Sequence, residues 1–163
     1  MKIVNIYAKD YIKKEDKIRE GSRGILIDND KILLVYSKKY DQYFIPGGGL
    51  EENESIAECC KRELLEETGY NVNVKNHYLT INEYYNDFLW IGYYFICEYA
   101  GMGERQLTNS EKEVSLEVRW ISILEALDIF SKYDDYEIEN RFKRGAYLRE
   151  YNALKEYINI KEE

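Results

Sequence analysis

The chain has 163 residues and a formal net charge of −8, from 31 acidic and 23 basic side chains. This length suits one domain over residues 1–163, and an apolar content of 45% excludes a disordered chain. The acidic balance argues against a nucleic-acid polymer or an anionic membrane as a partner, because both attract a basic surface.

The N-terminus and the cysteines bear on location. The first ten residues lack the long apolar segment of a secretory signal, and apolar runs such as residues 88–97 are too short to span a bilayer. The three cysteines include the adjacent pair Cys59 and Cys60, which is a poor disulfide framework and suits small buried side chains. We therefore expect a cytoplasmic protein.

Short apolar runs predict strands in the first part of the chain. A first strand is expected at Lys2–Tyr7, and the charged stretch Tyr11–Glu20 is expected to form a loop or a surface strand. The runs Arg23–Ile27 and Ile32–Tyr36 are separated by the tetrapeptide DNDK, which is a hairpin signal. The chain then reaches its only proline, Pro46, and three consecutive glycines, where the backbone must take an unusual path.

Helix signals enclose the segment that follows the glycines. Ser55 and Glu58 have the S-x-x-E spacing of a capping box, and Gly69 is a typical residue after a helix C-terminus, so a helix is expected up to Thr68. The later predicted elements are strands at Asn71–Tyr85, Phe88–Tyr99 and Val114–Ile121, a short helix from Ser122 or Leu124 to Phe130, and an amphipathic helix around Tyr147–Ile158. This order predicts an α/β or α+β fold.

Three glutamates mark the chemically interesting part of the predicted helix. Glu63, Glu66 and Glu67 are spaced i, i+3, i+4, so their carboxylates share one face of the helix and repel one another. Clustered hard oxygen donors favour Mg²⁺ or Mn²⁺, although a solvated acidic surface is the ordinary alternative. The glycine segment before the helix, Glu54 ahead of its cap and Gly69 after it favour the metal site.

This array resembles the box of the Nudix hydrolase family, G-x5-E-x7-R-E-U-x-E-E-x-G-U, in which U is a bulky aliphatic residue. The chain matches every fixed position from Gly48 to Gly69, and the one departure is Tyr70, where an aliphatic residue is usual. The resemblance implies an α/β/α sandwich with a mixed β-sheet and a loop–helix–loop catalytic motif. Tyr70 is expected to begin a strand, face the core and leave the metal site unaffected.

The resemblance also implies roles for individual residues of the box. Glu66 and Glu67 are metal ligands, Glu63 is a further ligand or the general base, and Gly47 offers its backbone carbonyl to the metal. Glu54 and Arg62 hold loop and helix in register, with Arg62 orienting the carboxylates. Gly48 and Gly69 complete the structural motif, in which the glycines allow close approach to metal and phosphate.

Three candidates lie outside the box. Family members often supply one more carboxylate ahead of a tryptophan-containing strand. Glu111 and Glu113 both precede Trp120, and Glu113 is the preferred candidate, with exposed surface charges as the alternative for both. Arg23 on an early strand is a candidate for contact with phosphate, with a salt bridge as the alternative. Tyr85 is a candidate for stacking on a substrate ring.

The implied activity is metal-dependent hydrolysis of a pyrophosphate bond in a nucleoside diphosphate linked to another moiety. The implied catalytic residues are Glu63, Glu66, Glu67, Arg62 and Glu113, with Mg²⁺ or Mn²⁺ as cofactor. The alternative is a Nudix-like module that binds a nucleotide without cleaving it. The substrate within this class and the choice between monomer and homodimer stay open, because a fold does not select a substrate.

Overall fold

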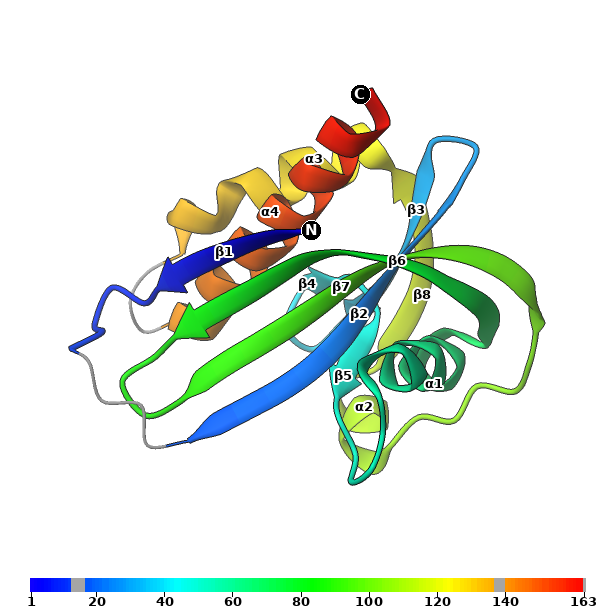
Figure 1. Ribbon diagram of the computed structural model, residues 1–163, viewed down its shortest axis with the longest axis horizontal. Helices are drawn as coiled ribbons and strands as arrows, with labels where there is room; N and C mark the ends of the chain where they lie inside the picture. The colour runs from blue at the N-terminus through cyan, green and yellow to red at the C-terminus, as the bar shows by residue number, and fades with distance from the viewer. Residues whose placement is uncertain (13–16, 137–139, 163) are drawn as a thin grey trace.

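The computed structural model describes residues 1–12, 17–136 and 140–162 (Figure 1). The strands of the described part are β1 Lys2–Tyr7, β2 Ile18–Asp28, β3 Lys31–Ser37, β4 Gln42–Phe44, β5 Gly47–Gly49, β6 Tyr70–Tyr84, β7 Leu89–Met102 and β8 Leu116–Ser122. The helices are α1 Ile56–Thr68, α2 Asn109–Glu113, α3 Ile123–Ser131 and α4 Arg141–Glu162, with a 3₁₀ turn, η1, at Lys132–Asp135. None of the described helices is both long and apolar enough to cross a bilayer.

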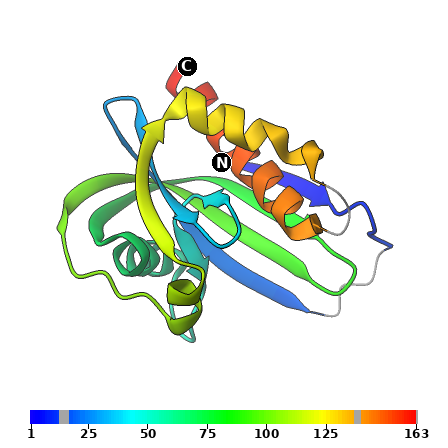
Figure 2. The same ribbon diagram turned by 180° about the vertical axis from the view of Figure 1, so that it is seen from behind.

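The strands form a mixed sheet in the order β1-β6-β7-β2-β3-β4, with β5 paired to β2 and β8 paired to β3. β1 runs parallel to β6 and β2 runs parallel to β7, whereas the pair β6–β7 is antiparallel. Helix α1 covers one face, and α3 and α4 cover the other, as the two opposite views show (Figures 1 and 2). The predicted α/β/α sandwich with a mixed sheet is therefore confirmed.

Each face of the sheet buries its own apolar cluster. On the α1 side, Leu64 and Cys60 of the helix pack against Leu26 and Phe95 of the sheet. On the opposite side, Leu154 of α4 belongs to a larger cluster with residues of α3 and several strands. The three cysteines are buried and free, as expected from the sequence. The two cores fix the sheet between its helices, and so fix the position of α1 relative to β5.

Several elements differ from the predicted boundaries. The glycine segment is a short strand rather than a loop: Gly47–Gly49 pairs antiparallel with Arg23–Gly21 through backbone groups alone. The unpredicted helix α2 begins at a second capping box, Thr108 and Glu111. β2 begins at Ile18, within the stretch predicted as a loop or surface strand, of which residues 13–16 lie outside the described residues.

Candidate active site

Arg62 of α1 joins the box into one hydrogen-bonded unit. Its Nε and one terminal nitrogen donate to both oxygens of Glu54 at 2.7 and 2.9 Å. The other terminal nitrogen donates to Glu63 at 2.7 Å and to Glu66 at 3.1 Å, and a further bond reaches the carbonyl of Gly49 at 3.0 Å. Bidentate guanidinium–carboxylate pairing is strong and directional. Arg62 thus fixes the helix, the loop before it and β5 relative to one another.

The strong pairing of Glu54 has a consequence for acid stability. The hydrogen bonds from Arg62 lower the pKa of Glu54 to about 2, from an ordinary value near 4.5. A carboxyl with a lowered folded-state pKa stabilises the protein above its unfolded-state pKa, and this contribution is lost as pH falls through the folded-state pKa. We expect Glu54→Gln to reduce the free energy of unfolding at pH 7 by roughly 1–2 kcal/mol.

Urea unfolding of Glu54→Gln and wild type from pH 7 down to pH 3 would measure this effect. The difference between them should shrink between pH 4.5 and 3, because over this range the carboxyl of Glu54 protonates in the unfolded state while it stays ionised in the folded state. The matched control is Glu52→Gln, since Glu52 is an exposed neighbour in the same loop. A constant difference across the pH range would show that the charge of Glu54 is not its source.

A second unit consists of three carboxylates that converge from two helices. Glu63 and Glu67 of α1 and Glu111 of α2 each place one oxygen within 4.8 Å of the others. Glu63 and Glu67 are each 8% exposed. Glu66, predicted as a ligand with them, lies outside this cluster and is held by Arg62. The structure therefore brings together two of the three box glutamates and adds one carboxylate from outside the box.

The added carboxylate is Glu111, whereas the sequence favoured Glu113. Glu111 occupies the third position of α2, where its carboxylate accepts the backbone N–H of Thr108 at 2.6 Å. Residues two apart on a helix do not share a face. The same turn that carries Glu111 to the cluster therefore points Glu113 elsewhere, and the preference for Glu113 is corrected.

Burial changes the acidity of the cluster. Desolvation raises the pKa of Glu67 to about 8, even though its carboxylate accepts the backbone N–H of Gly47 at 2.8 Å. Burial also raises the pKa of Glu63, and Arg62 opposes this shift. A buried carboxylate with a raised pKa lacks sufficient positive charge nearby. The cluster therefore has the electrostatics of a site that is completed by a cation.

The glycines of β5 are required by close packing against these carboxylates. A Cβ on Gly48 would lie 2.5 Å from the carboxyl carbon of Glu63. Gly47 has φ = 152°, and a Cβ there would lie 2.6 Å from Cγ of Arg23. Any side chain at either position would push β5 away from α1. The carbonyl of Gly47, predicted as a metal ligand, belongs to a residue whose N–H already binds Glu67.

Arg23 lies beneath this segment and holds its backbone. One of its terminal nitrogens donates to the carbonyl of Ile45 at 2.6 Å, and its Nε lies 3.7 Å from Glu150 of α4. Its charge also lowers the pKa of Glu67. The structure thus shows Arg23 in the salt bridge that was the alternative to phosphate contact. Its charge is also close enough to act on the carboxylate cluster.

Glu150 belongs to a buried ion network that sequence reasoning missed. Arg149 donates to Glu150 at 2.9 and 3.2 Å and to Glu83 of β6 at 2.9 Å. Glu150 is fully buried and Glu83 is 1% exposed. The partners come from β2, β6 and α4 and are far apart in the sequence. Their only sequence signal is the presence of charged residues at positions where strand and helix periodicity expects the interior.

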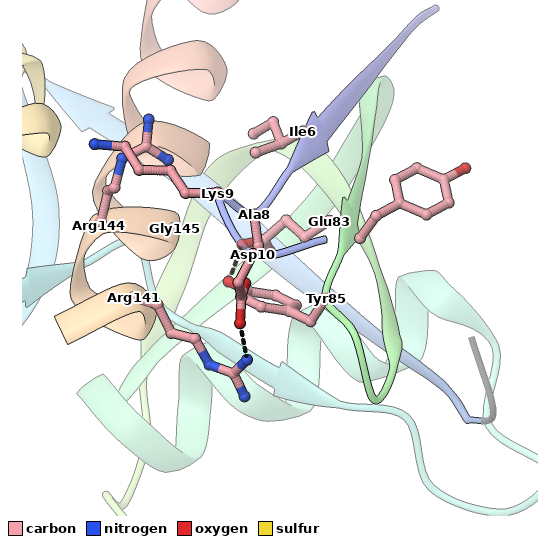
Figure 3. A pocket seen from close by; sticks show the side chains of 10 residues that line it. Ile6, Ala8, Lys9, Asp10, Glu83, Tyr85, Arg141, Arg144 and Gly145 are labelled. Atoms are coloured by element: carbon pink, nitrogen blue, oxygen red, sulfur yellow. Dashed lines mark hydrogen bonds and ion pairs between the residues drawn. The ribbon is translucent and has the colours of Figure 1, made fainter. Parts of the chain in front are cut away.

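Tyr85, the candidate for substrate stacking, is bound to this network. Its hydroxyl donates to Glu83 at 3.0 Å, and its ring stacks on Phe88 with centroids 4.7 Å apart. It lines a cavity of about 20 Å³ beside Arg141 and Asp10 (Figure 3), which has room for about one water molecule. The contacts among the described residues do not connect Tyr85 with the carboxylate cluster.

Tyr70, the residue that departs from the box pattern, begins β6 as expected. Its hydroxyl accepts the indole N–H of Trp120 at 3.0 Å, and the two rings meet edge to face. The tyrosine therefore changes packing at the end of α1, away from the ion-paired face of the helix.

Together, the fold and the box define a Nudix-type domain. The family model described as the NUDIX domain matches residues 19–142, which is more than half of the chain. The chain belongs to the Nudix hydrolase family.

Individual relatives agree with this assignment. The chain is 30% identical over 102 residues to the 8-oxo-dGDP phosphatase NUDT18 of Danio rerio, and 36% identical over 59 residues to Nudix hydrolase 18, mitochondrial, of Arabidopsis thaliana. These matches cover 60% and 36% of this chain but only 30% and 34% of the relatives, so the chain matches about a third of their length. The names of these relatives support the prediction of an enzyme.

A solved structure agrees in fold. The NUDIX hydrolase from Nitrosomonas europaea superimposes with a TM-score of 0.61 at 23% identity, covering 84% of this chain and 90% of that one. At this level of identity the likeness concerns the arrangement of the sheet and helices alone. It supports the α/β/α architecture described above.

Proposed function

We propose that this protein is a metal-dependent hydrolase that cleaves a pyrophosphate bond in a nucleoside diphosphate linked to another moiety. The observation that carries the proposal is the convergence of Glu63, Glu67 and Glu111 within 4.8 Å, beside a side-chain-free strand. Metal-bound carboxylates next to bare backbone are suited to a phosphate chain, which needs both cations and close approach.

The residues fit a hard divalent cation. Among the described contacts, one oxygen of each carboxylate is fixed by a hydrogen bond: Glu63 by Arg62, Glu67 by the N–H of Gly47, and Glu111 by the N–H of Thr108. Such contacts orient ligands, and all-oxygen donors select Mg²⁺ or Mn²⁺. Glu66, which shares Arg62 with Glu63, and the carbonyl of Gly47 remain proposed further donors.

When bound, the metal supplies charge neutralisation of phosphate oxygens and lowers the pKa of a water molecule. The side chains of this protein orient the carboxylates and accept the proton. Arg62 keeps the carboxylate of Glu63 aligned, and the cluster offers a carboxylate oxygen to take the proton of the attacking water. Arg23 keeps the backbone of β5 in place through the Ile45 carbonyl.

A substrate panel tests the proposal. Nucleoside triphosphates, nucleoside diphosphates, a nucleotide sugar and a dinucleoside polyphosphate would be incubated with Mg²⁺ or Mn²⁺, and the nucleotide products would be separated by ion-exchange chromatography. We expect hydrolysis of at least one substrate, loss of activity with excess EDTA, and recovery when Mg²⁺ is added back. Activity that survives full chelation would contradict the proposal.

The alternative is a binding module that holds a nucleotide without cleaving it. Calorimetric titration that detects nucleotide binding under conditions in which no product forms would favour it. All box glutamates are present, and Arg62 is hydrogen-bonded to Glu54. This supports the hydrolase hypothesis, because a module that only binds a nucleotide does not require the full set.

The choice between Glu111 and Glu113 gives a matched pair of variants. We expect Glu111→Gln to lower kcat/KM by about a hundredfold, since it removes one charge from the cluster. Glu113→Gln, two residues away on the same short helix, should change it by less than twofold. The rate of nucleotide product formation under saturating Mg²⁺ measures both. Equal losses would assign the effect to the helix rather than to the carboxylate.

A further inference from the structure

Trp90 of β7 lies across a strip of backbone that carries no side chains. Gly21 of β2 and Gly92 of β7 are paired in register. A Cβ on Gly21 would lie 2.6 Å from Cζ2 of Trp90, and one on Gly92 would lie 3.4 Å from its Nε1. The indole ring therefore rests on the two glycines, and a side chain at Gly21 would displace it, whereas the position of a Cβ on Gly92 is in ordinary van der Waals contact with it.

The same ring is adjacent to β5. The position of a Cβ on Gly21 is also in close contact with the carbonyl oxygen of Gly48. Gly48 in turn packs against the carboxylate of Glu63. Gly48 therefore lies between the two groups: the indole of Trp90 is near its carbonyl, and the carboxylate cluster is near its Cα. A ligand with phosphates at the cluster would have its remaining part close to Trp90.

A cavity of about 610 Å³ opens between Trp90 and the loop after β5. This volume lies in the usual range for small-molecule sites. Arg19 is also in the lining and has no ion pair among the described residues, with its guanidinium 5.4 Å from the ring centroid of Phe88. The lining residues are Ile18, Arg19, Glu20, Gly49, Leu50, Glu51, Glu52 and Trp90.

The burial of Trp90 shows which part of the residue a ligand can reach. Its Nε1 has no hydrogen-bond partner among the described residues and is sealed from solvent beside Gly92. The residue as a whole is only partly buried. A ligand in the cavity therefore meets the carbon part of the indole ring and not its nitrogen.

We propose that Trp90 binds the nucleobase of the substrate, with the indole ring as a stacking surface. This inference rests on the proposed function for the placement of the phosphates. It names Trp90 as the residue that makes this site select a nucleoside over a simple pyrophosphate. Arg19 pairs with Trp90 in the sheet and lies over Phe88, so its charge is on the side of the cavity away from the carboxylate cluster.

Fluorescence tests the proposal separately from catalysis, because the chain has two tryptophans. Trp120→Phe leaves Trp90 as the only indole, and Trp90→Phe leaves Trp120. Both variants would be titrated with α,β-methylene analogues of ADP and GDP in the presence of Mg²⁺. Methylenediphosphonate, which has the same bridge and no base, is the matched ligand.

We expect at least one nucleotide analogue to change the emission of Trp120→Phe, and methylenediphosphonate to leave it unchanged. The same analogue should leave the emission of Trp90→Phe unchanged. Binding measured by calorimetry without any change in Trp90 emission would overturn the proposal, as would an equal change in both variants. Because these ligands cannot be hydrolysed, the titration tests base binding even if no hydrolysis of any substrate is found.

Kinetics adds a second measurement. Trp90→Ala should raise KM for a nucleotide substrate about tenfold, with kcat changed less than threefold, because base stacking contributes mainly to binding. Trp90→Phe keeps a smaller aromatic ring, so its KM should lie between those of Trp90→Ala and wild type. If Trp90→Ala does not fold, the KM of Trp90→Phe and the fluorescence titration still test the role of Trp90. An unchanged KM in Trp90→Phe and Trp90→Ala would overturn the assignment.

Discussion

Replacing Glu67 by glutamine is expected to lower kcat/KM about a thousandfold while leaving the fold intact. Glutamine keeps an oxygen that accepts the N–H of Gly47, so the position of β5 is preserved. It removes the negative charge that the proposed cation requires. Rates of nucleotide product formation under saturating Mg²⁺ measure the loss, and an unchanged kcat/KM would contradict the proposed role.

The same substitution should stabilise the metal-free protein. Burial raises the pKa of Glu67 to about 8, so the folded state holds a proton that the unfolded state loses near pH 4.5. The carboxyl therefore destabilises the fold increasingly as pH rises from about 4.5 to 8. In EDTA at pH 8, Glu67→Gln should raise the free energy of unfolding by roughly 1–3 kcal/mol.

Urea unfolding in EDTA at pH 5 and pH 8 checks this expectation, since the gain should be small at the lower pH. The control is Glu52→Gln, in which an exposed carboxylate is removed. A variant that is less stable than wild type at pH 8 would show that Glu67 is held by favourable contacts rather than strained by burial. A loss of activity together with a gain of stability would show that Glu67 is kept for activity at a cost in stability.

Glu150→Gln is expected to have the largest effect on stability. Glu150 is fully buried against Arg149 and Arg23, and neither guanidinium can leave the interior without moving α4 or β2. Breaking a buried ion pair leaves an uncompensated charge, which costs about 3–5 kcal/mol. Such a loss is a large part of the stability of a domain of this size.

The matched control is Glu156→Gln on the same helix. Glu156 pairs with Lys2, whose side chain is 53% exposed, and pairs of this kind contribute about 0–1 kcal/mol. Urea unfolding at pH 7 compares both variants with wild type. A loss of less than 1 kcal/mol in Glu150→Gln would show that the remaining partners of Arg149 are sufficient.

The box is the part of the site that sequence predicted well. Its capping residues Ser55 and Glu58, its C-terminal Gly69 and the pairing of Arg62 with Glu54 all involve residues close in the chain. Helix periodicity and capping act over a few residues, so their spacing alone determines which side chains share a face. The family pattern then supplied the order of layers around the helix.

Spacing could not place residues that meet across the fold. Glu111 reaches the cluster because α2 is capped at Thr108 and its first turn directs Glu111 toward α1. No local sequence pattern distinguished Glu111 from Glu113. Trp90 lies on Gly21 only because β7 and β2 are neighbours in the sheet.

The sequence by itself thus determined the helix of the Nudix box, its carboxylates, the glycine segment and the Nudix family. The tertiary structure decided the third carboxylate, the buried network of Arg149 and the position of Trp90. The reason is physical: helix caps and repeats are short-range and are encoded by neighbouring residues, whereas these contacts depend on strand order and on the packing of α2 and α4 against the sheet.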